Sequence, residues 1–175
     1  MFTPYRSLTR LLVTAGAVRG RKKFQKIVFI AQQLGYPFGE SFDLHVWGPY
    51  SEVVAMKLKE MTDWGFAREE VLPGPAGNHL YVYEPGPNAQ TALAGAPDPD
   101  PQFEGLTRLV THLNDQDATL LEGVATALYL RSKGLSDAEV SDRLPRLKPD
   151  KFPDADRVEA VLGFANQLDL FRYDG

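Results

Sequence analysis

The residues best suited to chemistry with an anion form a short basic run. Five cations fall within eight residues: Arg19, Arg21, Lys22, Lys23 and Lys26. They lie at the start of an expected helix, where the helix dipole favours anions, so each well-placed cation costs about 0.3–1 kcal/mol. Such a cost indicates a partner, and either a phosphate backbone or an acidic protein surface would supply the anions. A simply solvated loop is the alternative.

A second motif combines turn formers with aromatic side chains: Trp47, Gly48, Pro49, Tyr50 and Ser51. We expect a structural role, in which Gly-Pro breaks a strand, Ser51 caps the next helix and the two rings pack over the junction. The alternative is that Trp47 or Tyr50 contributes to a binding surface.

Catalytic and metal-binding patterns are weak. His45, His79 and His112 are scattered, and the chain has no cysteine. A nucleophile elbow, a phosphate-cradling glycine loop and a zinc-ligand spacing are all missing from the sequence. The carboxylates of Asp98 and Asp100 lie in a proline-rich stretch that is poorly suited to a rigid site. We therefore expect no enzyme, no metal and no cofactor.

Apolar periodicity predicts the elements that position these motifs. Helices are expected over 7–18, with Ser7 as N-cap and Gly20 as its end, and over 22–34. A strand over 42–46 and a helix over 52–64 follow, and then a β-hairpin made of residues 66–72 and 79–84. This order is that of a winged helix.

Beyond the hairpin, residues 85–101 hold five prolines and are expected to form a linker or a lid, not a core element. Helices are then predicted over 103–114, 118–133, 136–144 and 155–168. The 118–133 helix is expected to be central and buried, and the 136–144 helix to begin with a Ser136–Glu139 capping box. Residues 171–173 are a candidate last strand. The expected fold is α+β, mostly α: a winged-helix domain (1–84), a linker (85–101) and a helical extension (102–175) packed on the first domain.

Composition bounds the class of protein. The chain has 175 residues, 43% of them hydrophobic, and a net charge of −4. Its apolar runs are too short for a membrane span, and it opens with no secretory pattern, so a cytoplasmic location is expected. Residues 1–72 carry ten Lys/Arg against seven Asp/Glu, whereas residues 73–175 carry nine against sixteen. Acidic side chains of the second half form either a solvated face, a docking surface or an internal partner for the basic run; they are Asp115, Asp117, Glu122, Asp137, Glu139 and Asp142.

The two motifs together resemble the YwgA-like family, whose pattern is shared in general form by Panacea-type antitoxin domains. A Lys-apolar-Gln-Lys helix (Lys23 to Lys26) precedes a strand that ends in Gly-Pro-Tyr-Ser (Gly48 to Ser51). The stretch from Leu121 to Leu130, and Lys148-Pro149 before a last helix, also fit the YwgA-like pattern. The resemblance implies a winged helix with a helical extension and no particular activity.

Two functions follow as expectations. The first is a non-enzymatic regulator that binds double-stranded DNA through backbone contacts of the basic run, Lys57 and Arg68. Base reading is not expected, because the exposed positions of the 52–64 helix are Glu52, Lys57, Lys59, Glu60 and Asp63, without Arg, Asn or Gln. The second is a protein-interaction module of antitoxin or adaptor type. The oligomeric state is open, and exposed hairpins and terminal helices favour a homodimer. If the acidic helices neutralise the basic run, the DNA hypothesis loses its main support.

Overall fold

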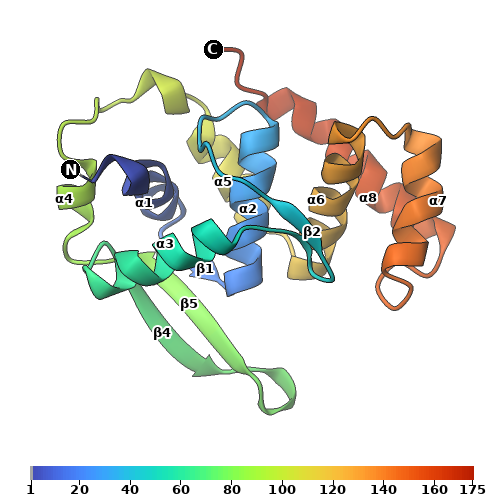
Figure 1. The fold of residues 1–175 in the computed structure, drawn as a ribbon, viewed down its shortest axis with the longest axis horizontal. Coiled ribbons are helices and arrows are strands. Elements are labelled where there is room, and N and C mark those ends of the chain that lie inside the picture. Colours follow the sequence, from blue (N-terminus) through green and yellow to red (C-terminus); the bar gives the residue numbers. More distant parts are fainter. Residues whose placement is uncertain (1) are drawn as a thin grey trace.

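A computed structural model describes residues 2–175 (Figure 1). The N-terminal half contains α1 (Thr3–Ala15), β1 (Val18–Arg19), α2 (Arg21–Gln33), β2 (Asp43–His45), β3 (Gly48–Tyr50), α3 (Glu52–Asp63), β4 (Ala67–Pro73) and β5 (His79–Pro85). The C-terminal half contains α4 (Ala89–Leu93), α5 (Leu106–Asn114), α6 (Ala118–Ser132), α7 (Asp137–Leu147) and α8 (Ala155–Gln167). Short 3₁₀ turns lie at Pro75–Gly77, Pro101–Phe103 and Leu168–Phe171. The α+β, mostly α prediction is confirmed.

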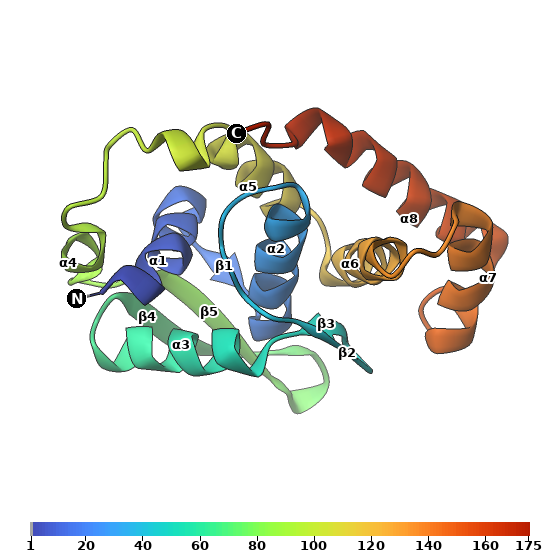
Figure 2. The same cartoon turned by 45° about the horizontal axis from the view of Figure 1, so that its top comes forward.

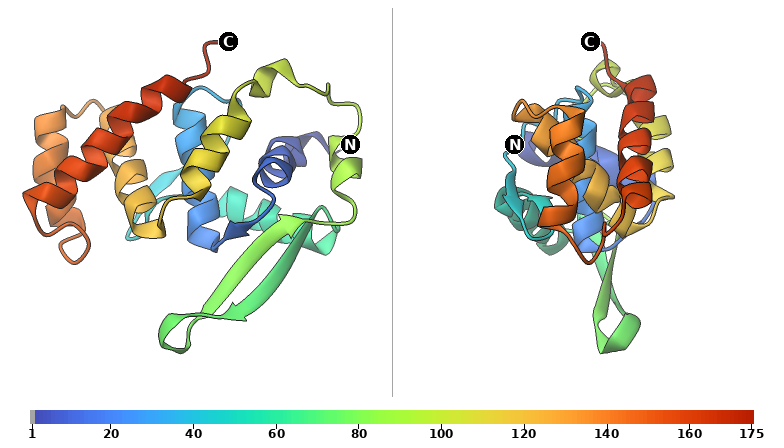
Figure 3. Two further views of the ribbon diagram at one scale, coloured as in Figure 1. Left: turned by 180° about the vertical axis from the view of Figure 1, so that it is seen from behind. Right: turned by 90° about the vertical axis from the view of Figure 1, so that its right-hand side faces the viewer.

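Two small antiparallel sheets frame the N-terminal half. The larger has the order β1-β5-β4, and its β4–β5 hairpin projects away from the helical body (Figure 3). The smaller pairs β2 with β3, with Leu44 opposite Pro49 and His45 opposite Gly48. The predicted order of helix, helix, strand, helix and hairpin is therefore present, with β1 and β3 added to it.

Helix α2 is the centre of the molecule. Every residue from Phe24 to Ala31 is buried, because α2 packs on α5, α6, α3, β1 and β3 (Figure 2). Helix α6 is buried almost all round from Leu121 to Ala127, which confirms the predicted central helix. One continuous core cluster joins residues of both halves. No helix among residues 2–175 is long and apolar enough to cross a membrane.

The first predicted helix is wrong at both ends. It starts at Thr3, with Pro4 in the first turn, where proline is pre-organised for a helix and its missing N–H costs nothing. Ser7 consequently lies inside the helix and caps nothing. The helix ends at Gly16, which takes a φ of +73°, so Val18 and Arg19 are free to pair with β5 instead.

Three further predictions need correction. Gly48-Pro49 does not break the strand: the two residues are part of β3, where an edge position tolerates the missing proline N–H. Residues 171–173 are not a strand, since the chain there leaves a 3₁₀ turn and Tyr173 makes one backbone bond, to Leu34. The proline-rich 85–101 segment lies over α1, as a lid would, but its α4 also buries Ala89 and Ala92 and so joins the core.

Candidate functional site: an exposed hairpin over a lysine cluster

The cations of the basic run do not form one open surface. Arg19 and Lys22 are exposed. The guanidinium of Arg21 lies 3.6 Å from the centre of the Tyr81 ring, donates to the Tyr83 hydroxyl at 3.0 Å and is 3.6 Å from a Glu69 carboxylate oxygen. Arg21 thus has partners within the fold, although its side chain remains 55% exposed.

Lys23 and Lys26 both turn inward. Lys23 donates to the backbone carbonyl of Asn114. Burial lowers the pKa of Lys23, and the nearby carboxylates Asp115 and Asp117 partly offset that effect. Lys26 is 1% exposed, so its ammonium group cannot reach a phosphate in solution. The acidic half therefore faces part of the basic run.

The two other predicted DNA contacts lie apart from the basic run and are paired. The ammonium of Lys57 is 2.6 Å from a carboxylate oxygen of Glu40, which is itself buried. Arg68, on β4, is 3.9 Å from Glu84 on β5.

Gln25 and Lys26 explain why the two sequence motifs occur together. The Gln25 amide donates to the carbonyl of Ser51 at 2.9 Å and accepts from the Ser51 N–H at 3.0 Å. Lys26 donates to the carbonyl of Pro49 at 2.8 Å. The Ser51 hydroxyl accepts from the Val54 N–H, so Ser51 caps α3 as predicted. Helix α2 thereby fixes the backbone of β3 and the start of α3.

Gly48 lies against α6. Its φ of +82° is costly for a residue with a side chain, and a Cβ there would be 2.9 Å from the Thr126 hydroxyl and 3.4 Å from Lys26 Cε. Glycine thus lets the hairpin backbone lie directly on the polar side chains beneath it.

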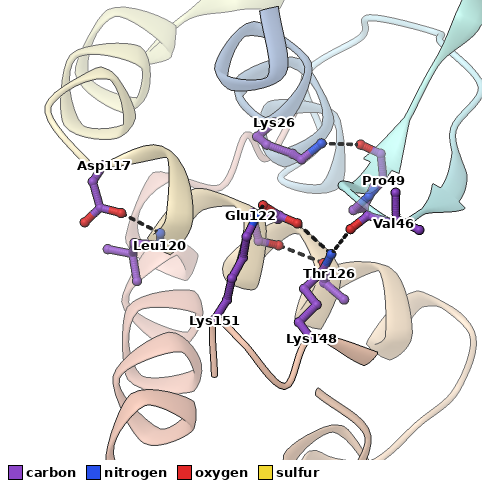
Figure 4. Close-up of polar contacts among 9 residues, drawn as sticks. All are labelled: Lys26, Val46, Pro49, Asp117, Leu120, Glu122, Thr126, Lys148 and Lys151. Atoms are coloured by element: carbon purple, nitrogen blue, oxygen red, sulfur yellow. Dashed lines mark hydrogen bonds and ion pairs between the residues drawn. The ribbon is translucent and has the colours of Figure 1, made fainter. Parts of the chain in front are cut away.

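Those side chains form a lysine cluster: Lys26, Lys148 and Lys151 around Glu122 (Figure 4). Lys148 donates to Glu122 and to the carbonyl of Val46, both at 2.6 Å, and Lys151 contacts the other Glu122 oxygen. Since Lys148 and Glu122 come from the C-terminal half and Val46 and Pro49 from the N-terminal half, the cluster joins the two.

The pKa values reflect this arrangement. Burial lowers the pKa of Lys26 to about 8, an effect that Glu122 opposes and that Lys148, Lys22 and Lys151 strengthen. Burial alone would raise the pKa of Glu122, but the hydrogen bonds from Lys148 and Lys151 outweigh it and hold that pKa below its ordinary value. Four lysines therefore act on this region against the single carboxylate of Glu122.

Above the cluster, the β2–β3 hairpin tip presents apolar groups to solvent. Val46 is 80% exposed and Trp47 39%. The rings of His45, Trp47 and Tyr50 pack on one another, and the Lys22 ammonium lies 4.9 Å from the centre of the Trp47 ring. Trp47 and Tyr50 thus do pack over the junction, while the tip itself stays open.

Helix α3 continues this apolar exposure. Val53 and Met56, one turn apart, are 43% and 52% exposed. Neither residue was predicted as a contact, because only the charged positions of this helix were weighed as binding residues.

Glu122 was placed among acidic side chains that would form a solvated face, a docking surface or an internal partner for the basic run, and its 5% exposure and its effect on Lys26 fit the last of these. A signal was present: one carboxylate in an otherwise apolar helix predicts a buried partner. Asp115, Asp117, Asp137, Glu139 and Asp142 are exposed. Within residues 2–175, no group of three or more His, Asp or Glu side chains is placed to hold a metal ion.

Comparison with known proteins yields one informative similarity. The chain is 28% identical over 168 residues to the uncharacterized protein YwgA of Bacillus subtilis (strain 168), a match that covers 96% of this chain and 98% of that protein. This supports the YwgA-like resemblance. No protein-family model matches the chain. The similar protein is uncharacterized, so the match brings no activity with it.

Proposed function

We propose that the chain is a non-enzymatic protein-interaction module of antitoxin or adaptor type, built on a winged helix. The observation that carries the proposal is the exposure of Val46, Trp47, Val53 and Met56 along the β2–β3 hairpin and α3, where a DNA-reading protein would present polar side chains. Exposed apolar side chains that follow one another over two connected elements are typical of a surface that binds protein.

The fate of the basic residues supports a protein over DNA as the partner. Binding to a phosphate backbone depends on free Lys and Arg side chains. Of the seven predicted contacts, Lys26 is buried, and Lys23 and Lys57 are partly buried and have partners within the fold. Arg21 and Arg68 are each close to a carboxylate, although their side chains stay 55% and 66% exposed.

The projecting hairpin supports the same choice. Strands β4 and β5 carry three acidic side chains, Glu69, Glu70 and Glu84, against the cation of Arg68. An acidic wing repels the phosphates that a wing would otherwise contact.

The burial of Lys26, the lysine whose pKa is lowered most, supports a non-enzymatic role. A lysine with a lowered pKa is a candidate nucleophile or base where a reactant can reach it. At 1% exposure, with its ammonium donating to Pro49, Lys26 has instead the surroundings of a structural residue.

The test has a DNA arm and a protein arm. A fluorescent generic DNA duplex is titrated with the protein at low salt, and no increase in anisotropy is expected. In parallel, tagged protein is purified from its native cells with nuclease present, and one stoichiometric protein is expected to remain bound. The double variant Val53→Ser, Met56→Ser should lose that protein.

Val71→Ser is the matched control, because Val71 is also exposed (49%) but lies on the β4–β5 hairpin. Duplex binding that weakens steeply with salt and disappears in Arg19→Glu, Lys22→Glu would contradict the proposal and restore the DNA regulator. The homodimer stays a prediction, which light scattering of the purified chain checks.

A further inference from the structure

We infer that the tip of the β2–β3 hairpin is the anchor point for the partner, and that the partner contributes a segment combining acidic with apolar side chains. This inference rests on the proposed function and specifies its partner chemistry. Three features of the tip carry it: its rigidity, its apolar exposure and the surplus of positive charge beneath and beside it.

The tip is held rigid by contacts that do not cover it. Lys148 binds the carbonyl of Val46, Lys26 that of Pro49, and the Gln25 amide pairs with the backbone of Ser51. A preorganised loop loses little conformational entropy when a partner binds. The Val46 side chain is nevertheless 80% exposed.

The charge around the tip selects an anionic partner. Lys148 and Lys151 pair with the carboxylate of Glu122, and the charges of Lys26 and Lys22 lie near enough to add to the positive charge of this region. Lys26 and Lys148 are buried, so they act only through their field, whereas Lys22 is exposed and the Lys151 side chain is 41% exposed, so a partner can contact both. On the hairpin stretch itself, Asp43 lies opposite Tyr50 at the end away from the tip, and Glu52 lies in the first turn of α3.

Apolar and cationic groups meet at Trp47. Its ring carries the Lys22 ammonium on one side and packs against His45 and Tyr50. A partner segment could place an apolar side chain against Val46 and Trp47 and carboxylates against Lys22 and Lys151, and so match the apolar and the cationic groups of the tip. Duplex DNA offers the anions but no apolar group of matching size beside them, so an acidic protein segment fits better.

The two tryptophans make the test specific to the site. Trp47 is at the tip, and Trp64, 45% exposed, caps α3 against Tyr5 and Phe66. Three peptides of identical apolar sequence, carrying four Glu, four Gln or four Lys, are titrated into ¹⁵N-labelled protein up to about 1 mM. The Glu peptide should shift the indole N–H signal of Trp47 and not that of Trp64, and should bind at least tenfold more tightly than the other two.

Lys22→Glu should weaken binding of the Glu peptide at least tenfold, whereas Lys133→Glu should leave that binding unchanged. Lys133, the C-cap residue of α6, is the matched control, because its ammonium also lies over a ring, 5.2 Å from the centre of Tyr129. Equal binding of the three peptides, or an unchanged Trp47 signal with all of them, overturns the inference. Concentration-dependent Trp47 shifts without peptide would identify a second copy of the chain as the occupant and overturn it too. These outcomes would not contradict the proposed function, because that proposal is tested separately by whether Val53→Ser, Met56→Ser loses the bound protein.

Discussion

Replacing Glu122 with glutamine removes the one carboxylate of the lysine cluster without changing its shape. Glu122 and Lys148 have side chains that are 6% and 5% exposed, so the variant leaves a buried ammonium without its counter-charge. Breaking such a pair by removing one partner costs about 3–5 kcal/mol. The contact with Lys151, whose side chain is 41% exposed, adds at most about 1 kcal/mol. We expect Glu122→Gln to lower the free energy of unfolding by about 3–6 kcal/mol at pH 7.

A double-mutant cycle with Lys148→Met isolates the pair. Methionine fills a similar volume and brings no charge, so the double variant should recover much of the stability that Glu122→Gln loses. The assay is urea unfolding of the four proteins, followed by circular dichroism. A loss below about 1 kcal/mol in Glu122→Gln, or additive losses in the double variant, would refute the assignment of a buried, coupled pair.

Three further predictions concern stability. The pKa of Lys26 is about 8 in the folded protein and 10.5, its ordinary value, in the unfolded chain, so the unfolded chain binds more protons between these two pH values. The free energy of unfolding of the wild type should therefore rise by about 2–3 kcal/mol from pH 7.5 to pH 10, relative to that of Lys26→Met. If urea unfolding shows the same pH dependence for both proteins, the prediction is refuted. Gly48→Ala should cost about 2–3 kcal/mol in urea unfolding through its positive φ and its approach to Thr126, and a neutral result would contradict the hairpin geometry. Gly123→Ala places a new Cβ 2.5 Å from Phe152, so it should lower the free energy of unfolding by about 1–3 kcal/mol. Gly163→Ala has open space around the new Cβ and should raise the free energy of unfolding by up to about 1 kcal/mol. Thermal melts of the two variants check these opposite changes.

Long periodic elements could be predicted from the sequence and short paired ones could not. Helices α2, α3 and α6 bury enough residues at helical spacing that their existence and extent were evident. Strand β1 has two residues and exists because β5 lies beside it, a tertiary contact that leaves no local pattern.

The candidate site was predictable in its parts but not in its arrangement. The Gln25-Lys26 and Gly48-to-Ser51 motifs were visible, and Ser51 was correctly assigned as a cap. Their mutual hydrogen bonds depend on residues 26 positions apart meeting in space. The inward turn of Lys26 depends on the Pro49 carbonyl and on Glu122, which is 96 residues further along the chain, so the apparently free basic run keeps exposed side chains only at Arg19, Arg21 and Lys22.

The claim that the hairpin tip is a protein-docking surface is tested most directly by placing a photo-crosslinking amino acid at position 46 and, as control, at position 71. Both positions hold exposed valines on β-hairpins. After irradiation in native cells, the account predicts a crosslink from position 46 to one protein species, unaffected by nuclease, with no such product from position 71. A nuclease-sensitive product at position 46, or the same products from both positions, would contradict it.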